Sequence, residues 1–272
     1  MSASVNYHRE GAGPPLVLLH GVGHHWQAWQ PVIDLLAGEF DVIACDSPGF
    51  GRSAPLSGAI EPTIPAYVDA FELFLAELGL DRPHVAGSSM GGAIALELAR
   101  SRAVSSATAI CPVGFWNAAE ARYCQLVLGS LARVPQALRP ATLSLARTRS
   151  GRRALLTTLY GFPTRVPPEE AVASFEDAWA SPALIRTLEH LGDYRFAPMG
   201  RPRGVPITVA WGVRDHLLPY ARQAPRARAM LPWATHVGLG GGHLPLADDP
   251  AATAAVIRTC AGSARPTVVT AD

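Results

Sequence analysis

Residues 84–92 read HVAGSSMGG, and this stretch decides the fold class of the chain. Gly87, Ser89 and Gly91 match the pattern GxSxG, with a short apolar run before it and an Ala- and Leu-rich stretch after it. This pattern at a junction of strand, tight turn and helix is typical of a nucleophile elbow, which lifts a serine hydroxyl clear of a sheet. We therefore predict a strand, a sharp turn at Ser89 and a helix over residues 90–100.

The residues around Ser89 suit both the turn and chemistry at the hydroxyl. Gly87, Gly91 and Gly92 provide backbone without bulk where the chain must reverse sharply. The free N–H groups and the dipole at the start of the following helix favour developing negative charge. Ser88 is in the wrong register for the motif. The alternative interpretation is a glycine-rich strand–helix turn in which the serine is idle.

The first half of the chain alternates short apolar runs with helical patterns, which is typical of βα units and a mostly parallel sheet. Helical segments then dominate, and a strand-like run returns after Pro206. We predict an α/β fold with a mostly parallel central sheet flanked by helices. Its core comprises residues 1–113 and 199–272, and residues 114–198 form an inserted helical cap that leaves the sheet after about the sixth strand. The expected strands are 16–19, 41–44, 84–86, 104–111, 206–211 and 235–237, and the expected helices are 26–37, 65–78, 90–100 and 249–260.

Composition excludes several classes of function. A formal net charge of +1 with 17% charged residues argues against a nucleic-acid partner. The sequence has no lysine, which excludes Schiff-base chemistry, PLP enzymes and the lysine of a phosphate-binding loop. The first ten residues hold no apolar signal-peptide region, and no apolar run approaches the roughly 18 residues of a membrane span. We expect a cytoplasmic monomer or homodimer that acts on a small molecule.

We expect neither a metal nor a cofactor. His24 and His25 are adjacent, but no HExxH motif or carboxylate cluster accompanies them. Residues 19–23, LHGVG, begin like a dinucleotide-binding fingerprint, but Trp26 stands where its third glycine is needed. The cysteines are far apart and form no CxxC pair, which predicts small buried side chains at Cys45, Cys111, Cys124 and Cys260.

A serine hydroxyl needs a base, and His243 is the candidate. It lies in the glycine-rich segment GGGHLP between the last expected strand and the last helix, where a loop side chain can reach a site. The base needs a carboxylate to hold one tautomer, and Asp215 lies four residues beyond the strand end at Trp211. Asp248 and Asp249 are predicted as caps of the last helix. The alternatives are a structural histidine and a helix-capping Asp215.

These motifs together resemble the α/β-hydrolase fold superfamily, in particular its lid-bearing serine esterases. The resemblance rests on the elbow and on the chain order Ser89, Asp215, His243. It also rests on His20-Gly21 after the first strand, on DSPGFGRS at residues 46–53, and on the glycine before His243. It runs from about residue 16 to 112 and from about 205 to 257, and it does not extend to the cap.

The resemblance implies an oxyanion hole made of two backbone N–H groups. One belongs to Met90, directly after the nucleophile, and the other to Val22, which follows His20-Gly21. Backbone donors need only the right turn, which accounts for the glycines on either side of Val22.

The substrate pocket is expected between the cap and the loop after the first strand. We assign His24 to its mouth and Trp116 to its wall, while most other cap aromatics form the core of the cap. Between Arg122 and Arg165 the sequence has eight arginines and no acid. This stretch is interpreted as a solvated face, with steering of an anionic substrate or docking on a partner as the alternative.

The sequence thus predicts hydrolysis of a carboxylic ester, or a related acyl bond, of a small and largely apolar substrate through an acyl-enzyme. Haloalkane dehalogenases and epoxide hydrolases resemble this scaffold but carry Asp at the position of Ser89. Carbon–carbon hydrolases of ring-cleavage diketones resemble it too, but they usually have Trp where this chain has Leu244. Lactonase, perhydrolase, thioesterase and acyltransferase activities stay open, as does a ligand-binding sensor that does not turn over.

Overall fold

A computed structural model describes residues 4–58 and 60–264. Its centre is one seven-stranded sheet in the order β1-β3-β2-β4-β5-β6-β7. Strand β1 pairs antiparallel with β3, and every other neighbouring pair is parallel. The predicted α/β fold with a mostly parallel sheet is confirmed. The strands are β1 (Tyr7–Glu10), β2 (Pro15–Leu19), β3 (Asp41–Cys45), β4 (His84–Ser88), β5 (Ser106–Ile110), β6 (Ile207–Gly212) and β7 (Thr235–Leu239).

Strand β1 has no counterpart in the sequence prediction. Its residues YHRE are mostly exposed at the edge of the sheet, so no buried face imposes an apolar alternation on them. Even with β1 counted, the chain leaves the sheet after its fifth strand, β5. The expected departure after about the sixth strand is therefore wrong, because the chain turns away at Cys111 and Pro112 without adding another strand first.

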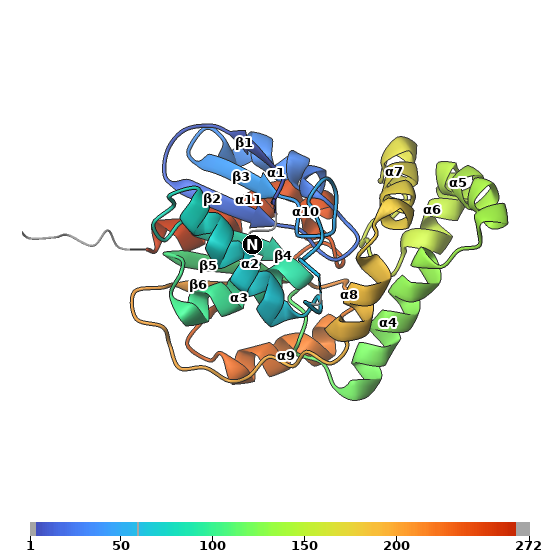
Figure 1. Cartoon of the computed structure of the whole chain (residues 1–272). Helices are drawn as coiled ribbons and strands as arrows, with labels where there is room; N and C mark the ends of the chain where they lie inside the picture. The colour runs from blue at the N-terminus through green and yellow to red at the C-terminus, as the bar shows by residue number, and fades with distance from the viewer. Residues whose placement is uncertain (1–3, 59, 265–272) are drawn as a thin grey trace, which may run out of the picture.

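Helices cover both faces of the sheet (Figure 1). Helix α3 (Met90–Ser101) packs on β4 and β5, and α2 (Ile64–Glu77) packs on α3. Helices α1 (Gln30–Leu36) and α11 (Pro250–Gly262) pack together, and α11 also contacts β5 and β6. All five residues of β5 are buried, as expected for a parallel strand covered on both faces. The remaining core helices are α9 (Tyr220–Met230) and α10 (Pro245–Asp248).

The single helix expected over residues 26–37 is divided into two. A 3-10 turn, η1 (Trp26–Trp29), precedes α1, and Pro31 occupies the first turn of α1. Proline suits that position because it lacks the N–H group that the first turn leaves without an intrahelical partner.

The predicted cap region, residues 114–198, contains a group of helices between β5 and β6. They form a separate layer beside the sheet (Figure 1), and we call residues 118–191 the helical insertion. The insertion comprises α4 (Ala118–Ala132), η2 (Gln136–Leu138), α5 (Arg139–Arg147), α6 (Arg149–Leu156), α7 (Pro168–Ala180) and α8 (Leu184–Leu191).

No helix among the described residues combines the length and hydropathy needed to cross a membrane.

Both ends of the insertion are fixed to the core. The rings of Phe115 and Phe196 lie 4.9 Å apart, and the Phe196 N–H donates to the Gly114 carbonyl at 3.0 Å. Glu120, in the first turn of α4, forms an ion pair with Arg226 of α9. The insertion is therefore anchored where the chain enters and leaves it.

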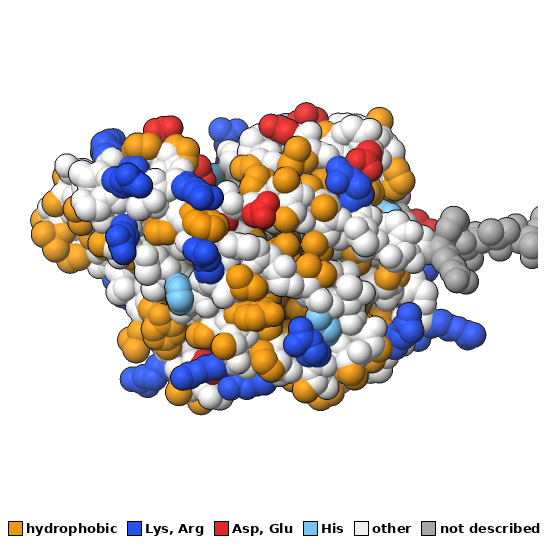
Figure 2. Space-filling model, turned by 180° about the vertical axis from the view of Figure 1, so that it is seen from behind, with side chains coloured by type: hydrophobic (Ala, Val, Ile, Leu, Met, Phe, Trp, Pro, Cys, Tyr) orange, Lys and Arg blue, Asp and Glu red, His pale blue; other side chains and the backbone are white. Residues whose placement is uncertain are grey.

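The arginines of the insertion are not all free on its surface. Figure 2 shows basic side chains scattered over the lobe that the insertion forms. Arg139 stacks over Trp179 at 4.8 Å, and Arg165 stacks over Phe162 at 4.2 Å. Arg152 is buried and donates to backbone carbonyls of its own helix pair. Part of the arginine-rich stretch thus holds the insertion together.

Candidate active site

Ser89 lies at the tight turn between β4 and α3, where the pattern placed it. Its φ of 56° is in the left-handed region, which costs a non-glycine residue energy. A Cβ atom at Gly87 would lie 2.0 Å from the Gly91 carbonyl oxygen, and one at Gly91 would lie 2.2 Å from the Leu19 carbonyl oxygen. Only glycine at both positions lets the backbone of β4 lie this close to the start of α3, and the start of α3 this close to the end of β2.

The structure brings Ser89, His243 and Asp215 together. His243 Nε2 lies 3.0 Å from Ser89 Oγ, and His243 Nδ1 lies 2.9 Å from Asp215 Oδ2. The side chains of His243 and Asp215 are 4% and 0% exposed, which shields their interaction from water. The serine hydroxyl, the imidazole and the carboxylate therefore form one continuous hydrogen-bonded chain.

Asp215 is held in place by the backbone after β6. Its Oδ1 accepts from the N–H groups of Leu217 and Leu218 at 3.0 and 2.7 Å, which leaves Oδ2 to face His243. The loop of His243 follows β7. Since β4, β6 and β7 are parallel, their carboxyl ends lie on one edge of the sheet, and side chains distant in sequence meet there.

The two predicted oxyanion donors lie on the loop after β2 and at the start of α3. A Cβ atom at Gly21 would lie 3.2 Å from Ser89 Cβ, so the backbone leading to Val22 runs against the serine. Among the described residues, the N–H groups of Val22 and Met90 donate to no protein acceptor. Both are thus available to an oxygen placed beside Ser89.

His20 supports this loop as a neutral side chain. Its Nε2 accepts from the Ser47 N–H at 2.8 Å, so Nδ1 carries the proton and donates to the Gly21 carbonyl at 2.7 Å. Burial lowers the pKa of His20 to about 4. The imidazole therefore links the turn after β2 to the turn after β3 without bringing a charge into the site.

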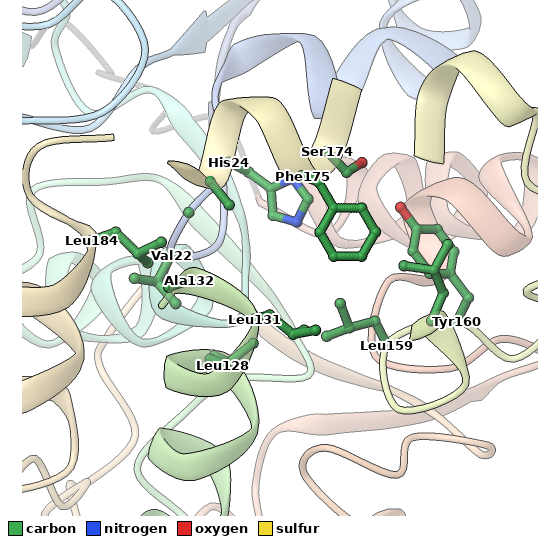
Figure 3. A pocket seen from close by; sticks show the side chains of 13 residues that line it. Val22, His24, Leu128, Leu131, Ala132, Leu159, Tyr160, Ser174, Phe175 and Leu184 are labelled. Atoms are coloured by element: carbon green, nitrogen blue, oxygen red, sulfur yellow. The ribbon is translucent and has the colours of Figure 1, made fainter. Parts of the chain in front are cut away.

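An apolar cavity lies between the loop after β2 and the insertion (Figure 3). Its volume is about 60 Å³, far below the roughly 300–1,000 Å³ of drug-sized ligand sites. His24 lines it, and burial lowers the pKa of this histidine to about 4. Trp116 does not line it: its indole N–H donates to the Tyr194 carbonyl at the base of the insertion. The apolar lining includes Val22, Leu128, Leu131, Leu156, Leu159, Phe175 and Leu184.

A second, larger and more polar cavity of about 280 Å³ adjoins the first. The two share His24, Tyr160 and Ser174 in their linings. The second cavity is also lined by Leu244, directly after His243 in the chain, while Ser89 and His243 are in the lining of neither cavity. His25 and Asp177 close one wall by forming an ion pair from the loop after β2 to α7.

Cys111, Asp215 and His243 are the one group of three or more metal-ligand side chains that the structure brings together in residues 4–58 and 60–264. The histidine nitrogen and the carboxylate oxygen in this group already face each other in a hydrogen bond. Burial raises the pKa of the Cys111 thiol, which keeps it protonated. The arrangement thus suits a proton path better than a metal.

Asp248 has a position that the sequence did not indicate. Only Asp249 caps α11, accepting from the Ala252 N–H at 3.1 Å. Asp248 instead accepts hydrogen bonds from the loop of His243 and from the insertion. An aspartate five residues after the histidine was the available signal, but the sequence could not show which segment its carboxylate would meet.

Comparison with known proteins agrees with the fold. The chain belongs to the alpha/beta hydrolase family, whose model matches residues 16–256. It is 30% identical over 258 residues to an uncharacterized protein of Mycobacterium tuberculosis (strain ATCC 25618 / H37Rv), covering 89% of this chain and 73% of that one.

Two solved structures share the fold at low identity. A thermophilic esterase from Thermogutta terrifontis is 21% identical with a TM-score of 0.70, covering 94% of this chain and 92% of that one. An enol-lactonase from Burkholderia xenovorans LB400 is 20% identical with a TM-score of 0.69, covering 94% and 95%. The predicted superfamily is confirmed, and the protein is a hydrolase by family.

Proposed function

We propose that this protein is a serine hydrolase that cleaves a carboxylic ester of a small, largely apolar substrate through an acyl-enzyme. One observation carries the proposal: the buried hydrogen-bonded chain from Ser89 Oγ through His243 to Asp215. A serine in ordinary solvent is a poor nucleophile, and an imidazole held in one tautomer is the group that activates it.

The proposed reaction has two steps. Ser89 Oγ bonds to the ester carbonyl carbon as its proton passes to His243 Nε2, and the N–H groups of Val22 and Met90 hold the oxyanion. The carbon–oxygen bond to the alcohol then breaks, and His243 gives its proton to that oxygen. A water molecule next attacks the acyl carbon, His243 takes its proton, and the proton returns to Ser89 as the acid leaves.

The cavities favour a short acyl group and a more polar alcohol. The apolar cavity is lined by Val22, one of the proposed oxyanion donors, and its small volume suits a short aliphatic chain. The alcohol must depart toward His243, which protonates it, and the more polar cavity is lined by Leu244, the residue after His243.

Lactone hydrolysis is the second candidate, since a lactone is an internal ester and needs the same steps. The fold shared with the enol-lactonase is compatible with lactone hydrolysis, but a shared fold does not by itself determine the substrate. Carbon–carbon hydrolysis is less favoured because Leu244 gives the substrate no ring or polar group next to the base. A ligand sensor with an idle site is the alternative from another class.

The test is covalent labelling. The purified protein is incubated with a fluorophosphonate, and its intact mass is recorded beside that of Ser89→Ala. A single adduct on the wild type that is absent from the variant is expected. No adduct on folded wild-type protein would overturn the serine-hydrolase proposal and favour the sensor.

A further inference from the structure

A segment of the insertion lies directly on the loop that carries His243. The Leu244 N–H donates to the Leu159 carbonyl at 3.1 Å. A Cβ atom at Gly161 would lie 2.7 Å from the Gly242 nitrogen, and one at Gly242 would lie 2.4 Å from the Gly161 nitrogen. The backbone between α6 and α7 therefore touches the backbone on both sides of His243.

The Asp248 carboxylate joins these two segments. Its Oδ2 accepts from the N–H groups of Gly161 and Gly242, both at 2.7 Å, and its Oδ1 accepts from the Phe162 N–H at 3.1 Å. Bonds from N–H groups to a charged oxygen are short and strong compared with neutral ones. One carboxylate thus binds two amides of the insertion and the amide just before His243.

We infer that Asp248 is a positioning residue that fixes His243 by tying its loop to residues 159–162 of the insertion. The inference rests on the proposed function. It makes the insertion part of the support for the base, in addition to a wall of the substrate cavity. Displacement of residues 159–162 would then shift the imidazole relative to Ser89, so that opening of the insertion and loss of activity are coupled.

The neighbouring aspartate provides a matched control. Asp249 has the same side chain and caps α11, and within the part of the chain that the structure describes this side chain makes no hydrogen bond to the His243 loop or the insertion. Asp248→Asn keeps the shape of the side chain but removes its charge and replaces one acceptor oxygen by a donor. Asp249→Asn makes the same chemical change one residue away.

The kinetic signature separates positioning from general damage. With 4-nitrophenyl acetate, Asp248→Asn is expected to lower kcat about tenfold or more with KM within about twofold of wild type, because small misplacements of a catalytic group cost rate before they cost binding. The rate of fluorophosphonate labelling should fall in parallel. Asp249→Asn should keep both rates near wild type and change Tm little, because asparagine caps a helix about as well as aspartate.

A second variant tests the contact from the insertion side. Gly161→Ala places a methyl group against the Gly242 nitrogen and should give the same fall in kcat with KM retained. Wild-type kcat and labelling rates in both Asp248→Asn and Gly161→Ala would overturn the inference while leaving the proposed function intact. Wild-type protein that neither labels nor hydrolyses the ester would overturn the proposed function, and this inference with it.

Discussion

His25, on the loop after β2, forms an ion pair with Asp177 of helix α7 and so connects the core to the far end of the insertion. Burial alone would lower the pKa of His25, but the Asp177 carboxylate outweighs it, and the pKa is raised above its ordinary value of 6.5. Asp46 adds to the rise. The strength of this ion pair therefore depends on pH, and both of its residues line the more polar cavity.

The sign of this pH dependence follows from the raised pKa. The ion pair contributes stability fully below the unfolded value of about 6.5, while Asp177 stays ionised, and loses it as the pH rises through the raised folded value. Replacing Asp177 by Asn should therefore lower Tm most near pH 6 and least near pH 9. Thermal melts of both proteins across this range test it, and a Tm deficit independent of pH would contradict it. His25→Gln should remove the same pH dependence.

The carboxylate that orients His243 should matter almost as much as the nucleophile. Asp215→Asn keeps the shape but allows the wrong histidine tautomer, and a loss of about 10⁴-fold in kcat is expected, the size that this change has in a serine protease of a different fold. The variant should still fold, since Oδ1 can keep its bonds to Leu217 and Leu218. Ester hydrolysis and circular dichroism are the measurements. Retention of more than a tenth of wild-type kcat would argue that Asp215 has another role.

The apolar cavity should limit the acyl chain. Leu131 lines this cavity, so Leu131→Ala would enlarge the cavity without changing Ser89. We expect kcat/KM for hexanoyl relative to acetyl esters of 4-nitrophenol to rise about tenfold, the order that one or two methylenes are worth in such pockets. Leu126→Ala, at an exposed position of the same helix, is the control and should leave the ratio unchanged. An unchanged ratio in Leu131→Ala would place the acyl chain elsewhere.

Gly91 should resist replacement although it lies in a helix. Helix propensity alone favours alanine over glycine by about 1 kcal/mol. The added Cβ would instead lie 2.2 Å from the Leu19 carbonyl oxygen, so Gly91→Ala should lower the free energy of unfolding by about 1–3 kcal/mol. Urea denaturation measures this. Gly38→Ala, where a Cβ meets nothing within 4 Å, is the matched control, and equal stability of the two variants would refute the steric argument.

Much of the fold was predictable because its signals are local. The helix expected over 65–78 is observed as Ile64–Glu77, and the strand expected over 206–211 as Ile207–Gly212. Strand β1 was missed because an exposed edge strand has no apolar period. The α-helix expected from residue 26 begins only at Gln30, because Pro31 favours a helix start there. The residues before Gln30 are equally compatible with a helix, so the sequence pattern does not reveal this boundary.

The sequence by itself determined the elbow at Ser89, the order of Ser89, Asp215 and His243, and the glycines that permit the turns. These features depend on residue type at fixed spacing, and backbone sterics act over only a few residues. The tertiary structure alone decided that His243 reaches Ser89 across 154 positions, that Trp116 turns away from the cavity, and that Asp248 binds the insertion. Such contacts depend on how distant segments pack, and a side chain's own neighbours in sequence do not contain that information.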